Sequence, residues 1–131
     1  MDWEITDWDS IAHLEKVAKS TKNTVKPSKN TVWWGLFDEK GQAQGCIGVL
    51  VLSGSKVRMK SHYVCVEHRN KGYGSEALKL AQDYCFNILG AKEIEIITRH
   101  YYYWRVRGYE LVKERNKNKF VMKITKEIYE K

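Results

Sequence analysis

The feature that most constrains this chain is a glycine-spaced turn between an apolar run and an amphipathic run, in residues 64–78. The apolar run predicts a strand that stops at Glu67, and the amphipathic run predicts a helix from about Ser75. The first turn of a helix carries unpaired backbone N–H groups and the positive end of the helix dipole. The turn therefore predicts a phosphate-binding site.

Two glycines and two cations in this turn favour a polyphosphate ligand. Gly72 and Gly74 have no side chains, so ligand oxygens can reach the backbone amides directly. Arg69 and Lys71 add cationic donors, and the planar guanidinium of arginine suits phosphate oxygens. The Walker pattern is absent, and no third glycine completes the dinucleotide fingerprint. Taken alone, the glycines also fit an ordinary strand-to-helix turn.

The pattern R-x-x-G-x-G, formed by Arg69, Gly72 and Gly74 between the predicted strand and helix, resembles the acetyl-CoA motif of the GNAT superfamily of N-acetyltransferases. The resemblance implies that the loop amides hold the pyrophosphate of acetyl-CoA. It also implies that the preceding strand, 63–66, splays from its neighbour and pairs its backbone with the pantetheine arm. Val66 stands where many members have proline. The cofactor-binding residues implied are Tyr63, Val64, Val66, Arg69, Asn70, Lys71, Gly72, Tyr73, Gly74, Ser75 and Trp104.

Length and composition predict a single domain spanning residues 1–131. Hydrophobic residues make up 43% of the chain, as in a globular fold, and no apolar stretch is long enough for a membrane span. The N-terminus lacks the pattern of a signal peptide, which predicts a cytoplasmic protein without membrane association. Cys46, Cys65 and Cys85 are widely separated, which predicts reduced thiols and no metal site.

The net charge of +7 suggests an anionic partner, and a polyphosphate cofactor accounts for part of it. The same charge also suits nucleic acid. We expect a monomer or a homodimer.

The hydrophobic periodicity predicts an α/β fold with an α+β mixed sheet. Strands are expected over residues 1–6, 32–38, 43–52 and 56–67, and the last three form an antiparallel meander. Asp9 or Ser10 caps a first helix, whose apolar face is Ile11, Leu14, Val17 and Ala18. A polar loop follows over 21–31.

The second half of the chain predicts a βαβ crossover around the glycine turn. The helix after the turn buries Ala77, Leu78, Ala81, Cys85, Ile88 and Leu89 and stops at Gly90. A strand over 93–98, a short helix over 100–108 and a hairpin over 109–125 complete the sheet. This order resembles the GNAT arrangement over nearly the whole chain, and Gly108-Tyr109-Glu110 resembles the family's G-F-E ending.

The resemblance leaves the general acid open. Many GNAT members place a tyrosine four residues before the glycine of the G-F pair, where this chain has Trp104. An indole cannot deliver a proton as a phenol does. A shift of register would give the role to Tyr103 or, less simply, to Tyr102. Otherwise solvent protonates the thiolate, and the aromatic residues serve only for packing.

The base and the acceptor site are predicted from the strand before the turn. Side chains alternate along a strand, so Arg58, Lys60, His62, Val64 and Val66 are expected on one face. His62 has the pKa that suits a base, although a strand histidine can equally be satisfied by a backbone carbonyl. Arg58 and Lys60 on the same face favour an acceptor that carries carboxylate or phosphate near its amine.

These observations predict an N-acetyltransferase that moves an acetyl group directly from acetyl-CoA to the primary amine of a small molecule or peptide. One alternative is a GNAT member that modifies an amine carried by nucleic acid, suggested by the basic charge and by the aromatic residues between Arg99 and Arg107. Another is an acyl-CoA-binding module without turnover, suggested by Trp104.

Overall fold

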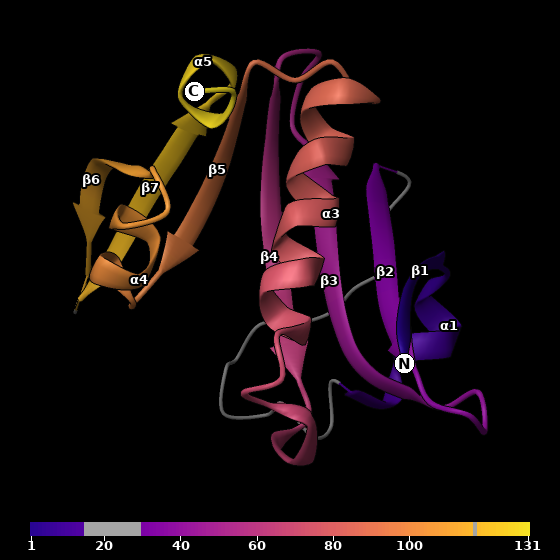
Figure 1. The fold of residues 1–131 in the computed structure, drawn as a ribbon. Helices are drawn as coiled ribbons and strands as arrows, with labels where there is room; N and C mark the ends of the chain where they lie inside the picture. Colours follow the sequence, from indigo (N-terminus) through magenta and orange to yellow (C-terminus); the bar gives the residue numbers. More distant parts are fainter. Residues whose placement is uncertain (15–29, 117) are drawn as a thin grey trace.

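In the residues that the computed structural model describes, 1–14, 30–116 and 118–131, seven strands form one sheet in the order β1-β2-β3-β4-β5-β7-β6 (Figure 1). β4 and β5 are parallel, and the other neighbours are antiparallel. The strands are β1 (Asp2–Thr6), β2 (Thr31–Phe37), β3 (Ala43–Val51), β4 (Lys56–Val64), β5 (Glu93–Thr98), β6 (Glu110–Arg115) and β7 (Lys119–Thr125). The predicted mixed sheet, with its antiparallel meander and βαβ crossover, is confirmed.

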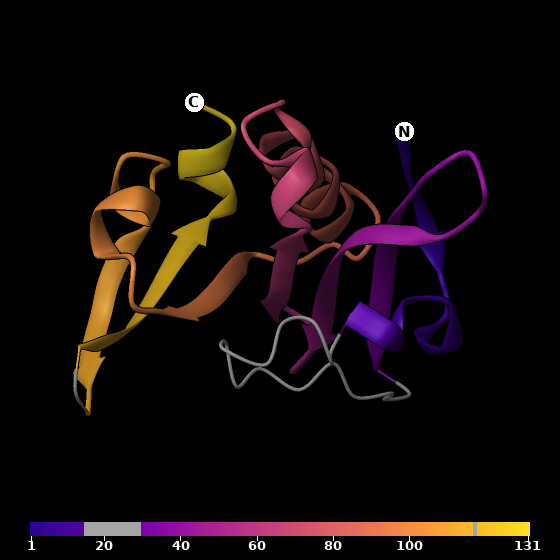
Figure 2. The ribbon, with the colours of Figure 1, turned by 90° about the horizontal axis from the view of Figure 1, so that it is seen from below.

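Helices cover both faces of the sheet (Figure 2). The long helix α3 lies on one face, and α1 lies on the opposite face. The main core forms between α3 and the sheet, and a smaller core under α1 contains Ile11, Leu14 and Trp33. The helical elements are α1 (Trp8–Ile11), the 3-10 turn η2 (Val66–His68), α3 (Tyr73–Asn87), α4 (Tyr101–Arg105) and α5 (Lys126–Tyr129).

The spacing of apolar residues explains why α3 forms and where it packs. Ala77, Leu78, Ala81 and Cys85 recur at intervals of three and four and are all buried, as predicted. Ile88 was expected on this face but is 68% exposed, because it lies at the C-cap where the helix ends.

Several boundaries differ from the prediction. β4 ends at Val64 and not at Glu67, because the chain turns into η2, and α3 begins at Tyr73, two residues before the predicted start. α5 was not predicted at all; the Thr125 side chain caps it by accepting a hydrogen bond from the N–H of Ile128. Ile11 and Leu14 of the first predicted helix are buried. Val17, Ala18 and the loop over 21–29 lie outside the described residues.

All three cysteines are free, as predicted. Cys46 and Cys85 are buried in the two cores, and burial raises the pKa of each thiol to about 12, so both are protonated thiols at neutral pH. Cys65 is only partly buried.

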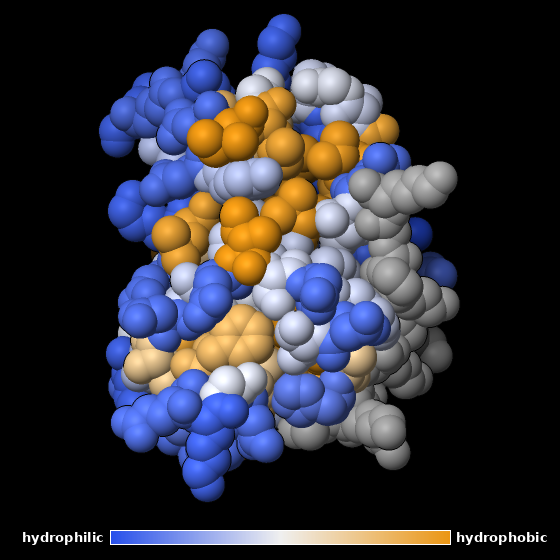
Figure 3. Space-filling model, turned by 90° about the vertical axis from the view of Figure 1, so that its right-hand side faces the viewer, coloured by the Kyte–Doolittle hydropathy of each residue, from blue (hydrophilic) through white to orange (hydrophobic). Residues whose placement is uncertain are grey.

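The surface is mixed in polarity. On the face seen in Figure 3, apolar residues gather in the upper half, and hydrophilic residues surround them.

None of the helices within the described ranges is both long and apolar enough to cross a bilayer. The prediction of a monomer or homodimer stays a prediction.

Candidate active site

β4 and β5 separate part-way along their length (Figure 1). Their parallel ladder ends at the pair Arg58 and Glu95. β5 then continues against β7 as far as Thr98, and β4 continues against β3 as far as Val64. We call the gap between them the splay. Within the described part of the chain, the edge of β4 that faces the splay has no strand partner, so its backbone can pair with an extended ligand.

The backbone of Val64 is directed into the splay. The neighbouring Cys65 N–H donates to Gln44 O at 2.8 Å, on the β3 side. Successive backbone groups along a strand point to opposite edges, so those of Val64 point away from β3. Its C=O accepts a hydrogen bond from Arg69 Nε at 2.8 Å. The Val64 N–H is therefore a donor that β4 directs into the splay.

A β-bulge at Ser61 interrupts the alternation of side chains along β4. Tyr63 pairs with Cys46 and Lys60 pairs with Gly48, so two residues, Ser61 and His62, lie opposite the single residue between Cys46 and Gly48. Ser61 has a φ of +57°, in the left-handed region. One extra residue in a strand places every side chain after it on the opposite face of the sheet from the face that strict alternation predicts.

The predicted shared face of Arg58, Lys60, His62, Val64 and Val66 is therefore wrong. Lys60 lies before the bulge, and its Nζ lies 5.3 Å from the ring centroid of Trp33, in the core under α1. His62 lies after the bulge and contacts Gly74 at the start of α3, on the other face. Val66 is not on the strand at all, because it begins η2 and is 69% exposed.

The glycine turn has an open backbone that suits anion binding. Asn70 and Gly72 adopt left-handed φ values of 63° and 88°. Gly72 is the N-cap of α3 and offers no side-chain cap, and a Cβ added to it would meet no atom within 4 Å. The first turn of α3 therefore has no capping side chain from Gly72, and the space beside the Gly72 Cα is open. Trp3 Nε1 fixes the start of the helix by donating to Tyr73 O at 3.0 Å.

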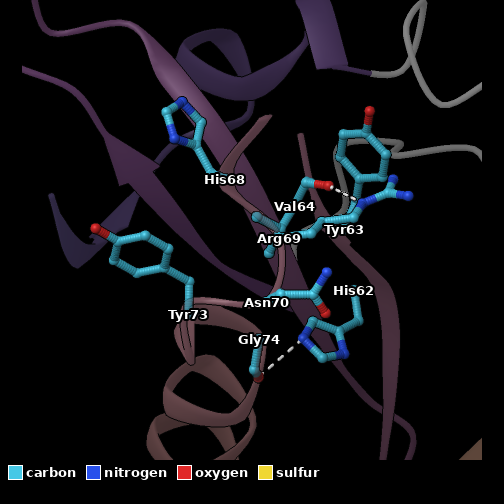
Figure 4. Close-up of a pocket in the computed structure, with 8 residues that line it drawn as sticks. All are labelled: His62, Tyr63, Val64, His68, Arg69, Asn70, Tyr73 and Gly74. Atoms are coloured by element: carbon cyan, nitrogen blue, oxygen red, sulfur yellow. Dashed lines mark hydrogen bonds between the residues drawn. The ribbon is translucent and has the colours of Figure 1, made fainter. Parts of the chain in front are cut away.

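A pocket of about 330 Å³ lies where β4, the turn and α3 meet (Figure 4). It brings together six of the predicted cofactor-binding residues and the predicted base His62. His68, a histidine that was ranked below His62 as a base, also lines it. The lining residues are His62, Tyr63, Val64, His68, Arg69, Asn70, Tyr73 and Gly74. Ser75 lines a second pocket of about 480 Å³, with residues of α3, Arg107 and Tyr129.

The hydrogen bond of His62 fixes its tautomer. Its Nε2 lies 3.0 Å from Gly74 O (Figure 4). A carbonyl only accepts, so Nε2 carries the proton and donates, which leaves the lone pair of the neutral ring on Nδ1. Burial lowers the pKa of His62; the hydrogen bond to Gly74 acts against this, and the charge of Arg107 adds to it. His62 is therefore neutral at pH 7.

The two aromatic residues considered for the general acid have different surroundings. Trp104 is only 8% exposed and packs in the main core, with its ring edge-on to Tyr109 at 5.0 Å between centroids. Tyr103 is 38% exposed, and the guanidinium of Arg107 lies 3.5 Å from the centre of its ring. Arg107 also donates to the backbone carbonyl of Tyr103 at 2.7 Å. Tyr103 is thus held by Arg107 while its ring stays accessible.

The two predicted acceptor-binding cations are not equivalent. Arg58 donates through Nε and Nη2 to one carboxylate oxygen of Glu95, at 3.2 and 3.1 Å, so its charge is paired. Glu95 is 8% exposed and was not singled out from the sequence. Burial, followed by the charge of Arg58, lowers the pKa of Lys60. Of the two cations predicted to favour an anionic acceptor, Arg58 therefore has its charge paired with Glu95.

A family model described as the acetyltransferase (GNAT) domain matches residues 1–100. The chain belongs to the GNAT acetyltransferase family. No curated protein matches the sequence. The fold match extends beyond residue 100, because solved structures of N-acyltransferases cover 95% to 98% of this chain.

Three solved structures illustrate this similarity. An acyl-CoA N-acyltransferase from Pseudomonas aeruginosa has a TM-score of 0.76 and 12% identity over 95% of this chain and 99% of its own. A spermidine N-acetyltransferase variant from Vibrio cholerae has a TM-score of 0.74 and 13% identity over 98% and 97%. The PaiA N-acetyltransferase from Thermoplasma acidophilum, solved with coenzyme A, has a TM-score of 0.71 and 15% identity over 95% and 99%. At these identities the likeness concerns the fold.

Sequence reasoning missed the residues of this GNAT site that depend on register. The pairing of Glu95 with Arg58 follows from the alignment of two parallel strands that are far apart in sequence. The bulge at Ser61 has no glycine to mark it. The position of Arg107 over Tyr103 could have been suspected, because the two residues are four apart in a predicted helix.

Proposed function

We propose that this GNAT protein transfers an acetyl group from acetyl-CoA directly to a primary amine. The observation that carries the proposal is the unpaired edge of β4 in the splay, which leads directly to the open turn at the start of α3. An extended arm can pair with the first, and a pyrophosphate fits the second. The unpaired edge of β4 and the glycine turn lie end to end. A single ligand with a long arm and a pyrophosphate at one end of it could therefore occupy both.

The residues of the pocket fit acyl-CoA at both ends. The first-turn amides of α3, with Asn70, Lys71, Gly72, Gly74 and Ser75 around them, hold the pyrophosphate. Arg69 is anchored to Val64 through Nε, and its guanidinium lies 5.5 Å from the centre of the Tyr63 ring, so its remaining donors are held beside Tyr63 (Figure 4). The N–H of Val64 polarises the thioester carbonyl. Trp104 supports this site from the core, and only a small part of its surface could contact the arm.

Acetyl-CoA supplies an activated acetyl group, and the protein has to position the amine and move two protons. The amine nitrogen forms a bond to the thioester carbon, and the C–S bond breaks. His62 can take the proton of the amine through Nδ1, because its ring is neutral and its Nε2 is already committed to Gly74. Tyr103 can give its phenolic proton to the departing sulfur.

The acceptor is proposed to carry carboxylate or phosphate near its amine. Since Glu95 pairs the charge of Arg58, this proposal now rests mainly on Lys60. Lys60 lies on the α1 face of the sheet, opposite His62 and the start of α3. A cofactor on the α3 side and an acceptor on the α1 side would therefore meet at β4.

Each of the two alternative functions is supported by observations of its own. The core position of Trp104, together with the hydrogen bond that occupies His62, favours a module that binds acyl-CoA without turnover. The net charge of +7 and the 80% exposure of Tyr102 favour an amine carried by nucleic acid.

A transfer assay with labelled acetyl-CoA separates these functions. The proposal expects label on amines from a panel that includes acidic, neutral and basic acceptors, with the acidic ones preferred. Binding of CoA without transfer to any amine would support the binding module instead. Retention on nucleic acid that falls steeply with salt, combined with transfer to it, would support the nucleic-acid alternative.

A further inference from the structure

Arg107 lies in the turn between α4 and β6, and its side chain packs on Tyr103. The guanidinium carbon lies 3.5 Å from the centre of the Tyr103 ring. Its Nη1 also donates a hydrogen bond to the backbone carbonyl of Tyr103 at 2.7 Å. The hydrogen bond fixes the guanidinium, so the planar cation is held against the face of the phenol ring.

Arg107 also reaches the other side of the splay. It lines the pocket of about 480 Å³ together with Ser75, which belongs to the first turn of α3. Burial lowers the pKa of His62, and the charge of Arg107 lowers it further, so the two side chains are close enough to interact. His62 is on β4, and Arg107 follows α4, which comes after β5. Arg107 therefore approaches His62 from the opposite side of the splay.

Tyr103 lies beside the same pocket. Burial is the main cause that raises the pKa of Tyr109, and Tyr103 is among the neighbours that raise it further, so the two phenols are close. The hydroxyl of Tyr109 donates to Gln82 Oε1 at 2.6 Å, and Gln82 lines the pocket with Arg107. Tyr103 is itself 38% exposed. Arg107 thus connects the proposed acid to the proposed base.

We propose that Arg107 is a positioning residue that supports Tyr103 as the general acid. The inference rests on the proposed function, because it requires Tyr103 to protonate the departing thiolate. In that step the O–H bond of Tyr103 breaks and an S–H bond forms. A negative charge is left on the phenolate, and solvent later restores the proton. That charge spreads over the ring on which Arg107 is stacked. A cation there attracts the phenolate more strongly than the neutral phenol, so it stabilises the state after proton transfer.

The test is a double-mutant cycle of Arg107→Gln and Tyr103→Phe, with steady-state kinetics for transfer and calorimetry for acetyl-CoA binding. Arg107→Gln alone should lower kcat by about three- to thirtyfold and keep the parent's affinity for acetyl-CoA. Tyr103→Phe keeps the ring and has no proton to give, so adding Arg107→Gln to it should lower kcat no further. If Arg107 only held the ring in place, it would matter equally in both backgrounds.

Two further variants complete the experiment. Arg107→Lys keeps the charge and should retain part of the lost rate. Arg105→Gln is the matched control, because Arg105 is an exposed arginine in the last turn of α4, and it should keep the parent's kcat.

Three results would overturn the inference and leave the proposed transfer standing. The first is a parent-like kcat in Arg107→Gln or in Tyr103→Phe. The second is an equal loss of kcat from Arg107→Gln with and without the Tyr103 hydroxyl. The third is a loss of acetyl-CoA affinity in Arg107→Gln with kcat unchanged, which would make Arg107 a ligand-binding residue. A parent protein that transfers acetyl groups to no amine would overturn both the inference and the proposed function.

Discussion

Lys60 and His62 are two residues apart on β4, yet their side chains lie on opposite faces of the sheet. The bulge at Ser61 between them is the cause. The lysine therefore lies on the face covered by α1, and the histidine contacts the first turn of α3, which follows the glycine turn. This separation gives each residue its own expected effect on the reaction.

We expect Gly72→Asp to abolish measurable binding of CoA. The added carboxylate would stand at the N-cap of α3, where it caps the free amides and repels pyrophosphate. Calorimetry with CoA measures the loss. Gly41→Asp is the matched control, because Gly41 has a similar φ of 76° and also open space around it, in the turn between β2 and β3. Equal CoA affinity in the two variants would contradict the assignment of the turn.

Tyr103→Phe should lower turnover by about ten- to a thousandfold and leave the affinity for acetyl-CoA unchanged. The variant keeps the ring on which Arg107 stacks and removes only the hydroxyl. Steady-state kinetics and calorimetry together separate the two effects. Tyr102→Phe, at the adjacent and 80% exposed position, should have no effect on either. If Tyr103→Phe retains the parent's turnover and pH profile, Tyr103 is a packing residue.

His62 should make both stability and activity depend on pH below about 6.5. Burial lowers the pKa of the folded histidine below its ordinary value of 6.5. Between the two pKa values the unfolded chain binds a proton that the folded chain does not, so the free energy of unfolding falls as pH falls through this window. Thermal unfolding from pH 5 to 8 measures it, and His62→Gln should flatten the curve.

The same variant tests the role of His62 as a base. In the parent, kcat/KM should fall at low pH with the protonation of His62, and in His62→Gln that limb should disappear along with most of the rate. His100→Gln, at an exposed position, is the control and should keep the parent's profile. A variant that loses stability but keeps its rate and low-pH limb would make His62 a purely structural residue.

Lys60→Glu should change the ranking of acceptors. With the charge of Arg58 paired, Lys60 is the cation expected to attract an anionic group on the acceptor. Reversing it should raise KM for acidic amines and lower it for basic ones, and high salt should reduce both changes. Paired acidic and basic acceptors assayed at two salt concentrations measure the effect. An unchanged ranking would show that Lys60 takes no part in choosing the acceptor.

Arg58→Gln should affect stability more than acceptor choice. It leaves the Glu95 carboxylate, 8% exposed, without its ionic partner, at a cost of about 1–3 kcal/mol in the free energy of unfolding. Glu95→Gln alone should also destabilise, and the double variant should cost less than the sum of the two single ones. Denaturant unfolding of the four proteins measures the coupling. Strictly additive effects would show that the pair contributes nothing to stability.

Local hydrophobic patterns in the sequence predicted most of the strands and helices of the fold. The alternation and apolar runs of β2, β3 and β5, and the three-to-four spacing in α3, made these elements predictable because one buried face imposes a period on the sequence. Boundaries were less predictable. β4 ends at Val64 because the chain turns there into η2, and the apolar Val66 gives no sign of that turn.

For the site, the sequence by itself determined the glycine turn between β4 and α3, because glycines between a strand and a helix act through local backbone chemistry. Only the tertiary structure decided which residues meet across the sheet. The pairing of Arg58 with Glu95 depends on the register of two parallel strands, and the separation of Lys60 from His62 depends on one extra residue opposite β3. Register is set by packing of the whole sheet, and a single inserted residue reverses a face without leaving any periodic signal in the sequence.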